Sequence, residues 1–258
     1  MCEALGFKLP SKNDRIEIAA MLSNRRGDQA TVGMKLPKLR YVCVDDWVTQ
    51  QARGRSVLHL GCAGDYLEYG PARCLHGRIV GVAHCTWGVE IDPERLAKVR
   101  QWFPGDSEGR VRYLCGDVTR LQDLSINQSF EVILVGAIIE HLPNPGDMLE
   151  GIANLCGPDT RVIITTPHVF GFLQFVRVAL RRVEAVNPRH TCWFSIQTLT
   201  ELCSRYRLEP TAWLTGYGWQ PPSLRWSFQK MLGVPFFRFF PHVGGSLVGE
   251  FRLRAEGA

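Results

Sequence analysis

No run of 18 consecutive apolar residues occurs in this 258-residue sequence, so no segment has the composition of a membrane-spanning helix. The first fifteen residues, MCEALGFKLPSKNDR, also lack the apolar core that a secretory signal peptide requires. We therefore expect a cytoplasmic protein that is neither secreted nor embedded in a membrane.

Closely paired cysteines are missing too. None of the nine cysteines forms a C-x-x-C pair, the spacing typical of zinc sites and thiol redox motifs. Cys115 and Cys156 lie within apolar runs, where cysteine behaves as a small hydrophobic residue. The sequence thus predicts reduced thiols and no metal site.

A dense basic cluster is absent as well. The 30 lysines and arginines exceed the 25 acidic residues by only five, and they are scattered apart from pairs such as Arg25-Arg26 and Arg181-Arg182. Because nucleic acids attract concentrated positive charge, this distribution predicts a solvated surface and argues against a nucleic-acid partner.

Short apolar runs alternate regularly with longer segments along the sequence. The length of the chain suits one α/β domain with additions. Runs such as 132–135 are apolar on both faces, like central strands of a covered parallel sheet. The alternation predicts an α/β fold with a doubly wound, mostly parallel, seven-stranded, Rossmann-like sheet and an antiparallel last strand. The expected strands are 56–60, 86–91, 111–115, 130–135, 161–166, 211–215 and 246–253, and the expected helices are 39–52, 66–76, 93–102, 145–156, 169–183 and 196–206.

The domain boundary is expected near residue 54. Residues 1–54 form an N-terminal extension with a helix, which is a candidate substrate cap, and residues 55–258 form the main domain. That domain contains two aromatic-rich insertions, at about 169–190 and 219–242.

Two motifs in the first half of the main domain indicate chemistry. The segment SVLHLGCAGD (56–65) is an apolar strand that ends in a turn of small residues, and WGVEIDP (87–93) is a second strand that ends on Glu90. A glycine turn after one strand lets a ligand approach the backbone, and an acid at the end of the next accepts hydrogen bonds from ribose hydroxyls. The pair predicts a nucleoside-binding site.

These motifs belong to a longer series that resembles the class I S-adenosylmethionine-dependent methyltransferases of the small-molecule type. After the first two come YLCGDV (113–118), FEVILVGAIIEHLPNP (130–145) and RVIITTPH (161–168), in the family's order. The segment 187–210 is also similar to small-molecule members, in which a His and a Ser precede the helix before the sixth strand.

The resemblance implies a binding role for nine residues toward S-adenosyl-L-methionine, which leaves as S-adenosyl-L-homocysteine. The turn would pass its backbone under the methionine part, Glu90 would bind the ribose hydroxyls, and Asp117 would accept a hydrogen bond from the adenine amino group. The full set is Gly61, Cys62, Ala63, Glu90, Ile91, Asp117, Val118, Gly136 and Ala137.

The turn departs from the family pattern at three positions. His59 stands where the family usually has an acid, and Ala63 and Asp65 stand where it has glycines. His59 therefore contributes no fixed negative charge toward the cofactor.

Three histidines are candidate bases for the acceptor, because imidazole titrates near neutrality. His141 follows the fourth strand, His168 ends the fifth, and His190 lies in the loop expected over the site. The structural alternative for Glu140-His141 is a helix start with a packing role.

The helix expected over 169–183 has two interpretations. It either packs as a lid over a partly hydrophobic small-molecule acceptor or lies as an amphipathic element on a membrane surface. Aromatic residues and the basic end at Arg181-Arg182 fit both.

The favoured function is methylation of a hydroxyl oxygen on a sugar or secondary metabolite. An RNA or protein methyltransferase of the Asn-Pro-Pro-Tyr type is disfavoured, because that position is Gly136-Ala-Ile-Ile139, and a dehydrogenase is disfavoured by the lack of G-x-G-x-x-G. The alternative that stays open is a non-catalytic cofactor-binding or scaffold protein with a degenerate methyltransferase fold.

Overall fold

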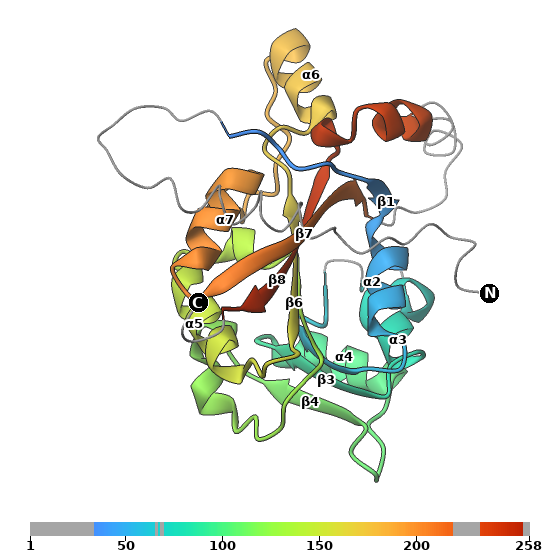
Figure 1. Ribbon diagram of the computed structural model, residues 1–258. Coiled ribbons are helices and arrows are strands. Elements are labelled where there is room, and N and C mark those ends of the chain that lie inside the picture. Colours follow the sequence, from blue (N-terminus) through green and yellow to red (C-terminus); the bar gives the residue numbers. More distant parts are fainter. Residues whose placement is uncertain (1–33, 65–66, 68–69, 219–232, 255–258) are drawn as a thin grey trace, which may run out of the picture.

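The computed structural model describes residues 34–64, 67, 70–218 and 233–254 (Figure 1). Asp65 and the expected extension up to residue 33 lie outside these residues. A single mixed sheet, flanked by helices, runs through the described residues. Its strands are β1 (Tyr41–Cys43), β2 (Ser56–Leu60), β3 (Cys85–Glu90), β4 (Val111–Cys115), β5 (Val132–Gly136), β6 (Arg161–Pro167), β7 (Leu208–Tyr217) and β8 (Ser246–Leu253).

The α-helices are α2 (Val44–Ala52), α3 (Leu75–Val80), α4 (Pro93–Trp102), α5 (Pro145–Leu155), α6 (Phe172–Arg181) and α7 (Ile196–Ser204). Short 3-10 turns are η3 (Pro71–Arg73), η4 (Val118–Leu124), η5 (Ile139–His141) and η6 (Pro241–Val243). No helix among the described residues combines the length and the apolar character that crossing a bilayer requires.

The sheet order is β1-β7-β8-β6-β5-β2-β3-β4. From β2 the chain moves outward through β3 to β4 and then returns to the other side of β2 at β5, so the order reverses between β2 and β5. Ligands of open α/β sheets bind beyond the carboxyl ends of the strands at such a reversal. This topology places the end of β2 and the end of β5 side by side.

The sheet has one strand more than the seven that the sequence predicts. The sequence predicts a helix from Leu39, whereas residues 41–43 form β1 and pair in parallel with β7. A three-residue strand is too short to show a periodic pattern, and the open edge of β7 decides its conformation. The predicted antiparallel last strand is confirmed, since β8 runs antiparallel to both β6 and β7.

A second difference concerns the helix expected over 66–76. The structure instead has η3 and then α3, which begins at Leu75. Gly70 adopts a φ of 86° directly before Pro71, and neither residue favours a continuous helix at this point.

The core lies on both faces of the sheet because successive strand residues point to opposite sides. On one face Leu58 and Ile133 pack with α5, η4 and α7. On the other face Val57 and Leu134 pack with α2 and α3. This double covering explains why runs such as 132–135 on β5 are apolar on both faces.

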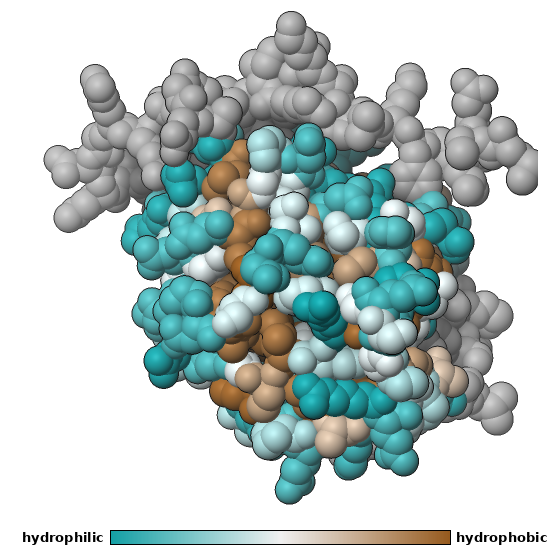
Figure 2. Space-filling view, turned by 90° about the horizontal axis from the view of Figure 1, so that it is seen from below, coloured by the Kyte–Doolittle hydropathy of each residue, from teal (hydrophilic) through white to brown (hydrophobic). Residues whose placement is uncertain are grey.

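The molecular surface differs between the two ends of the sheet. Seen from below, away from α6, hydrophilic residues predominate and hydrophobic residues lie in smaller patches between them (Figure 2). Most of the strongly exposed large hydrophobic side chains lie instead on 169–186 and 236–240, which include α6. In Figure 1, α6 projects at the upper end of β6.

Candidate active site

A cavity of about 810 Å³ opens at the carboxyl ends of β2, β3 and β5. All nine residues to which the family resemblance assigns cofactor contacts line it, together with His141 and His190. The volume falls within the range of ligand pockets in proteins, about 300–1,000 Å³. Motifs that lie far apart in the sequence therefore meet in one cavity.

The turn after β2 is tied to the neighbouring strand. The backbone amides of Gly61 and Cys62 both donate to the Val89 carbonyl, at 2.9 and 3.1 Å. Gly61 has a φ of 72°, and a Cβ there would lie 2.9 Å from Cδ1 of Ile138. Glycine is needed both for the left-handed backbone and for the close approach of Ile138.

Glu90 ends β3 inside the cavity with only 8% of its surface exposed. Its Oε2 accepts a hydrogen bond from the amide of Ala63 at 3.2 Å. Its Oε1 accepts from the amides of Ile91 and Asp92 at 3.1 and 3.2 Å. Both oxygens of the carboxylate are thus tied to backbone amides, so Glu90 fixes the turn and is itself held at the cavity.

Asp117 follows β4 and caps η4. Its Oδ1 accepts from the amide and the hydroxyl of Thr119, both at 2.8 Å. Val118 beside it is almost fully buried, while Ile91 is 62% exposed at the edge of the cavity. The site thus offers a carboxylate flanked by apolar side chains.

Gly136 and Ala137 form the end of β5. Ala137 has a φ of 50°, a conformation that costs a non-glycine residue energy and is often found at functional sites. Two hydrogen bonds hold it there, from its amide to the carbonyl of Thr165 at 3.0 Å and to its hydroxyl at 3.1 Å. The strand β6 therefore enforces the strained turn at the cavity.

His59 and His76 form a buried pair beneath the turn. Their Nδ1 atoms lie 3.1 Å apart, and the rings are stacked with centroids 5.3 Å apart. Burial lowers the pKa of His59 to about 3. Burial and the neighbouring imidazole lower the pKa of His76 well below its usual value. Both rings are therefore neutral near pH 7, with one donating to the other.

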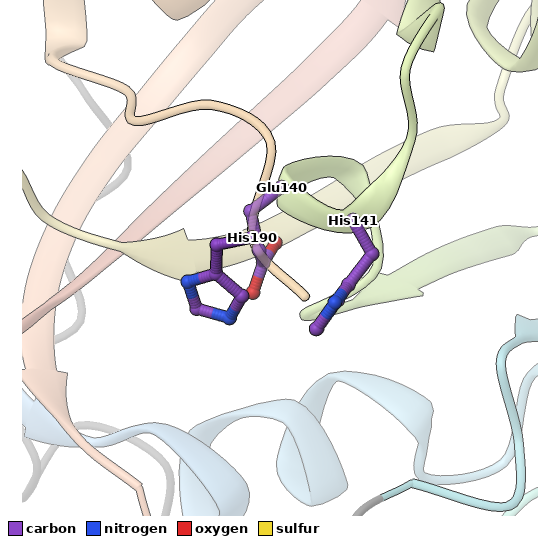
Figure 3. Close-up of side chains that lie close together, drawn as sticks. All are labelled: Glu140, His141 and His190. Atoms are coloured by element: carbon purple, nitrogen blue, oxygen red, sulfur yellow. The ribbon is translucent and has the colours of Figure 1, made fainter. Parts of the chain in front are cut away.

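A second cluster consists of Glu140, His141 and His190 (Figure 3). One ligand atom from each residue lies within 4.8 Å of those of the other two. The two imidazole rings meet edge to face with centroids 4.6 Å apart. Glu140 and His141 lie on η5 after β5, whereas His190 comes from the loop before α7.

His168 is placed differently from the other two candidate bases. It is 3% exposed, its Nδ1 lies 3.1 Å from the carbonyl of Gly244, and it is not among the residues that line the cavity. Burial lowers its pKa. His168 is therefore a buried residue outside the lining of the cavity.

Sequence reasoning missed His76, Thr165 and Thr166 as neighbours of the site. Thr166 Oγ1 donates to Oε2 of Glu140 at 3.1 Å from the adjacent strand β6. No local motif marks these residues, because their role depends on the pairing of β5 with β6 and on the position of α3.

Comparisons with known proteins agree on one family. Residues 38–212 match the model of a methyltransferase domain. A ubiquinone biosynthesis O-methyltransferase of Neisseria meningitidis is 29% identical over 116 residues, which cover 44% of this chain and 44% of that enzyme. The chain thus spans less than half the length of the curated relatives that it matches.

Solved structures show the same fold. A TehB-like S-adenosylmethionine-dependent methyltransferase from Corynebacterium glutamicum has a TM-score of 0.51 at 18% identity, over 81% of this chain and 86% of that one. The N-methyltransferase NodS of Bradyrhizobium japonicum, solved with S-adenosyl-L-homocysteine, has a TM-score of 0.50 at 12% identity, over 82% and 85%. With a family model that matches more than half of its residues, the chain belongs to the methyltransferase domain family.

Proposed function

We propose that this protein transfers the methyl group of S-adenosylmethionine to a hydroxyl oxygen of a small molecule. The observation that supports it most is that one cavity brings the expected cofactor residues together with His141 and His190. The curated relatives are named O-methyltransferases, which favours oxygen as the acceptor atom. A sugar or a secondary metabolite is the proposed substrate class.

The cavity offers the hydrogen-bond acceptors and the bare main chain that the cofactor requires. Gly61 has no room for a Cβ because Ile138 lies against it, so its main chain stays bare. Glu90 and Asp117 both line the cavity, and Asp117 has apolar neighbours. We propose that Glu90 accepts from the ribose hydroxyls, Asp117 from the adenine amino group, and that Ile91 packs on the ring. The main chain at Gly61–Ala63 then lies under the methionine part.

The departure at His59 is compatible with this cofactor. The sulfonium and the amino group of S-adenosylmethionine are positively charged, so a protonated histidine at this position would repel them. Burial holds His59 neutral, and its neighbour His76 is neutral for the same reason. The pair supplies no negative charge, but it introduces no repulsion.

The bound cofactor supplies an activated methyl group, and the protein has to align the acceptor and accept its proton. Of the three candidate bases, His141 and His190 line the cavity. We propose that one of them takes the proton of the acceptor hydroxyl as its oxygen attacks the methyl carbon.

We expect His190→Ala to lower the turnover number by about 100-fold, the lower bound of the contribution of general base catalysis. Cofactor affinity should stay within about twofold, because His190 is assigned to the acceptor side. The measurement is release of S-adenosylhomocysteine with a panel of phenols, sugars and alcohols, together with calorimetry of both cofactor forms.

The exposed His84→Ala is the matched control and should behave as wild type. Unchanged turnover in His190→Ala would remove it as the base. If neither cofactor form binds the wild-type protein up to millimolar concentration, the methyltransferase proposal fails. Binding without transfer to any acceptor would instead favour the non-catalytic scaffold.

The acceptor is proposed to be partly hydrophobic and to be reached from a membrane surface. None of the residues of α6 is buried, and Phe175 and Leu180 are 67% and 79% exposed. Arg177 and Arg181 recur at four-residue spacing on the opposite face of the helix. A helix with one apolar face and one cationic face matches an anionic lipid surface.

We also propose a cytoplasmic location, because all eight cysteines of the described residues are free thiols and free thiols are typical of a reducing compartment. Contact with a membrane is then peripheral and comes from the cytoplasmic side.

We expect the double variant Phe175→Asp, Leu180→Asp to bind vesicles of mixed phosphatidylcholine and phosphatidylglycerol at least tenfold more weakly than wild type. Burying each of these side chains in lipid contributes about 1.5–3 kcal/mol, and both contributions are lost. Co-sedimentation with the vesicles measures the effect. The control Phe175→Leu, Leu180→Met keeps the apolar surface and should bind. Equal binding of the acidic variant and wild type would rule out α6 as the contact.

A further inference from the structure

We propose that Glu140, His141 and His190 bind a divalent transition-metal ion that holds the methyl acceptor through two neighbouring oxygen atoms. The inference rests on the proposed function and deepens it, since it names the substrate class: a small molecule with adjacent oxygens, such as a 1,2-diol or a catechol. It departs from the sequence analysis, which predicted no metal site.

The three side chains converge from two separate segments (Figure 3). Their potential ligand atoms lie within 4.8 Å of one another, a spacing that one ion at the centre can bridge with bonds of about 2.0–2.2 Å after small rotations. Two imidazoles and one carboxylate are the donor set of open catalytic metal sites. All three residues line the cavity, so free coordination positions face the substrate space.

The surrounding hydrogen bonds hold this cluster in place. Glu140 is 1% exposed, and its Oε2 accepts from the hydroxyl of Thr166 at 3.1 Å, as second-sphere partners of metal ligands do. The carbonyl of Glu140 accepts from the amide of Thr191 at 2.8 Å. The hydroxyl of Thr191 also donates to the carbonyl of Leu142 at 2.8 Å. The loop that contains His190 is therefore fastened to the segment that contains the other two ligands.

A purely structural role explains these observations less well. A packing role for Glu140-His141 requires neither His190 nor an opening to the cavity, yet both are present.

Three protein ligands leave two or three positions open in a five- or six-coordinate ion, which is enough to chelate two adjacent oxygens. Coordination lowers the pKa of a bound hydroxyl. With both imidazoles bound to the ion, neither acts as the base, and the ion takes over the activation of the hydroxyl that a free His141 or His190 would otherwise provide. In the transfer, the acceptor hydroxyl releases its proton to water, the oxygen forms a bond to the methyl carbon, and the carbon–sulfur bond of the sulfonium breaks. S-adenosylhomocysteine leaves with a neutral sulfur, so charge and atoms balance.

The test is a titration of chelator-treated, full-length protein with Co²⁺, followed by its visible ligand-field absorption, which reports bound ion directly. We expect one ion per chain. We expect Glu140→Gln and His141→Ala each to weaken binding by about 100-fold or more, since changes outside the ligand set alone cost 10- to 100-fold. The exposed Glu94→Gln and His84→Ala are matched controls and should bind like wild type.

Calorimetry with S-adenosylmethionine on the same samples separates this proposal from the proposed function, because the metal ligands lie outside the assigned cofactor set. Circular dichroism and thermal unfolding confirm that each variant is folded, and His141→Ala alters only a half-buried side chain. Stoichiometric Co²⁺ binding without any cofactor binding would leave the metal site standing and refute the proposed function. Cofactor binding with no stoichiometric Co²⁺, or with Co²⁺ binding that is unchanged in both variants, would overturn the metal site.

Discussion

Glu90→Ala is expected to weaken the binding of S-adenosylmethionine and S-adenosylhomocysteine by about 30- to 1,000-fold. Two ribose hydrogen bonds to a carboxylate contribute about 1–2 kcal/mol each, and the loss of 2–4 kcal/mol gives this range. The change also removes the acceptor of the Ala63 amide at 3.2 Å, so the turn under the cofactor loses a restraint. Isothermal titration calorimetry measures both affinities.

Two further variants make this prediction specific. Glu90→Gln keeps one acceptor oxygen and should fall between Ala and wild type. Glu94→Ala removes a nearby exposed carboxylate on α4 and should leave both affinities unchanged. Wild-type affinity in Glu90→Ala would place the ribose elsewhere in the cavity.

The second large effect concerns stability in mild acid. The pKa of His59 is lowered to about 3 by burial, and that of His76 is lowered in the same direction. Both pKa values are near 6.5 in the unfolded chain. Between pH 6.5 and about 4 the unfolded state therefore binds more protons than the folded state. Stability is therefore fully present above pH 6.5 and falls as the pH decreases, by about 1.4 kcal/mol per pH unit for each histidine.

Urea unfolding between pH 4.5 and 7.5 measures this slope. In the double variant His59→Gln, His76→Gln, neither position titrates, so its free energy of unfolding should fall less steeply with acid than that of wild type. His84→Gln alters an exposed histidine and should leave the slope unchanged. Equal slopes in the double variant and wild type would mean that the buried pair does not govern acid sensitivity.

Much of the sheet could be predicted because its residues follow local rules. The strands 56–60, 111–115 and 246–253 and the helix 93–102 coincide with the predicted bounds. For the helix the reason is visible in the sequence, since Asp92 caps it by accepting from the amides of Glu94 and Arg95, and Pro93 occupies its first position. Such signals act over a few residues and need no tertiary partner.

The remaining differences arise where tertiary contacts override local preference. Residues 41–43 become a strand because β7 has an open edge to pair with. No pattern of three residues can reveal that edge. Gly70 and Pro71, which interrupt the helix before α3, can be recognised in the sequence. The length of the segment nevertheless favoured the prediction of one longer helix.

For the site, the sequence by itself determined the residues at the strand ends. A turn of small residues, Glu90 and Asp117 each come at the end of an apolar strand, and the carboxyl ends of parallel strands meet at one edge of the sheet. Only the tertiary structure decided which of the three candidate histidines face the cavity, and that Glu140 joins two of them. It also paired His59 with His76. The physical reason is distance along the chain: His190 is brought to η5 by hydrogen bonds between Thr191 and Glu140, and no short-range pattern encodes contacts between segments so far apart.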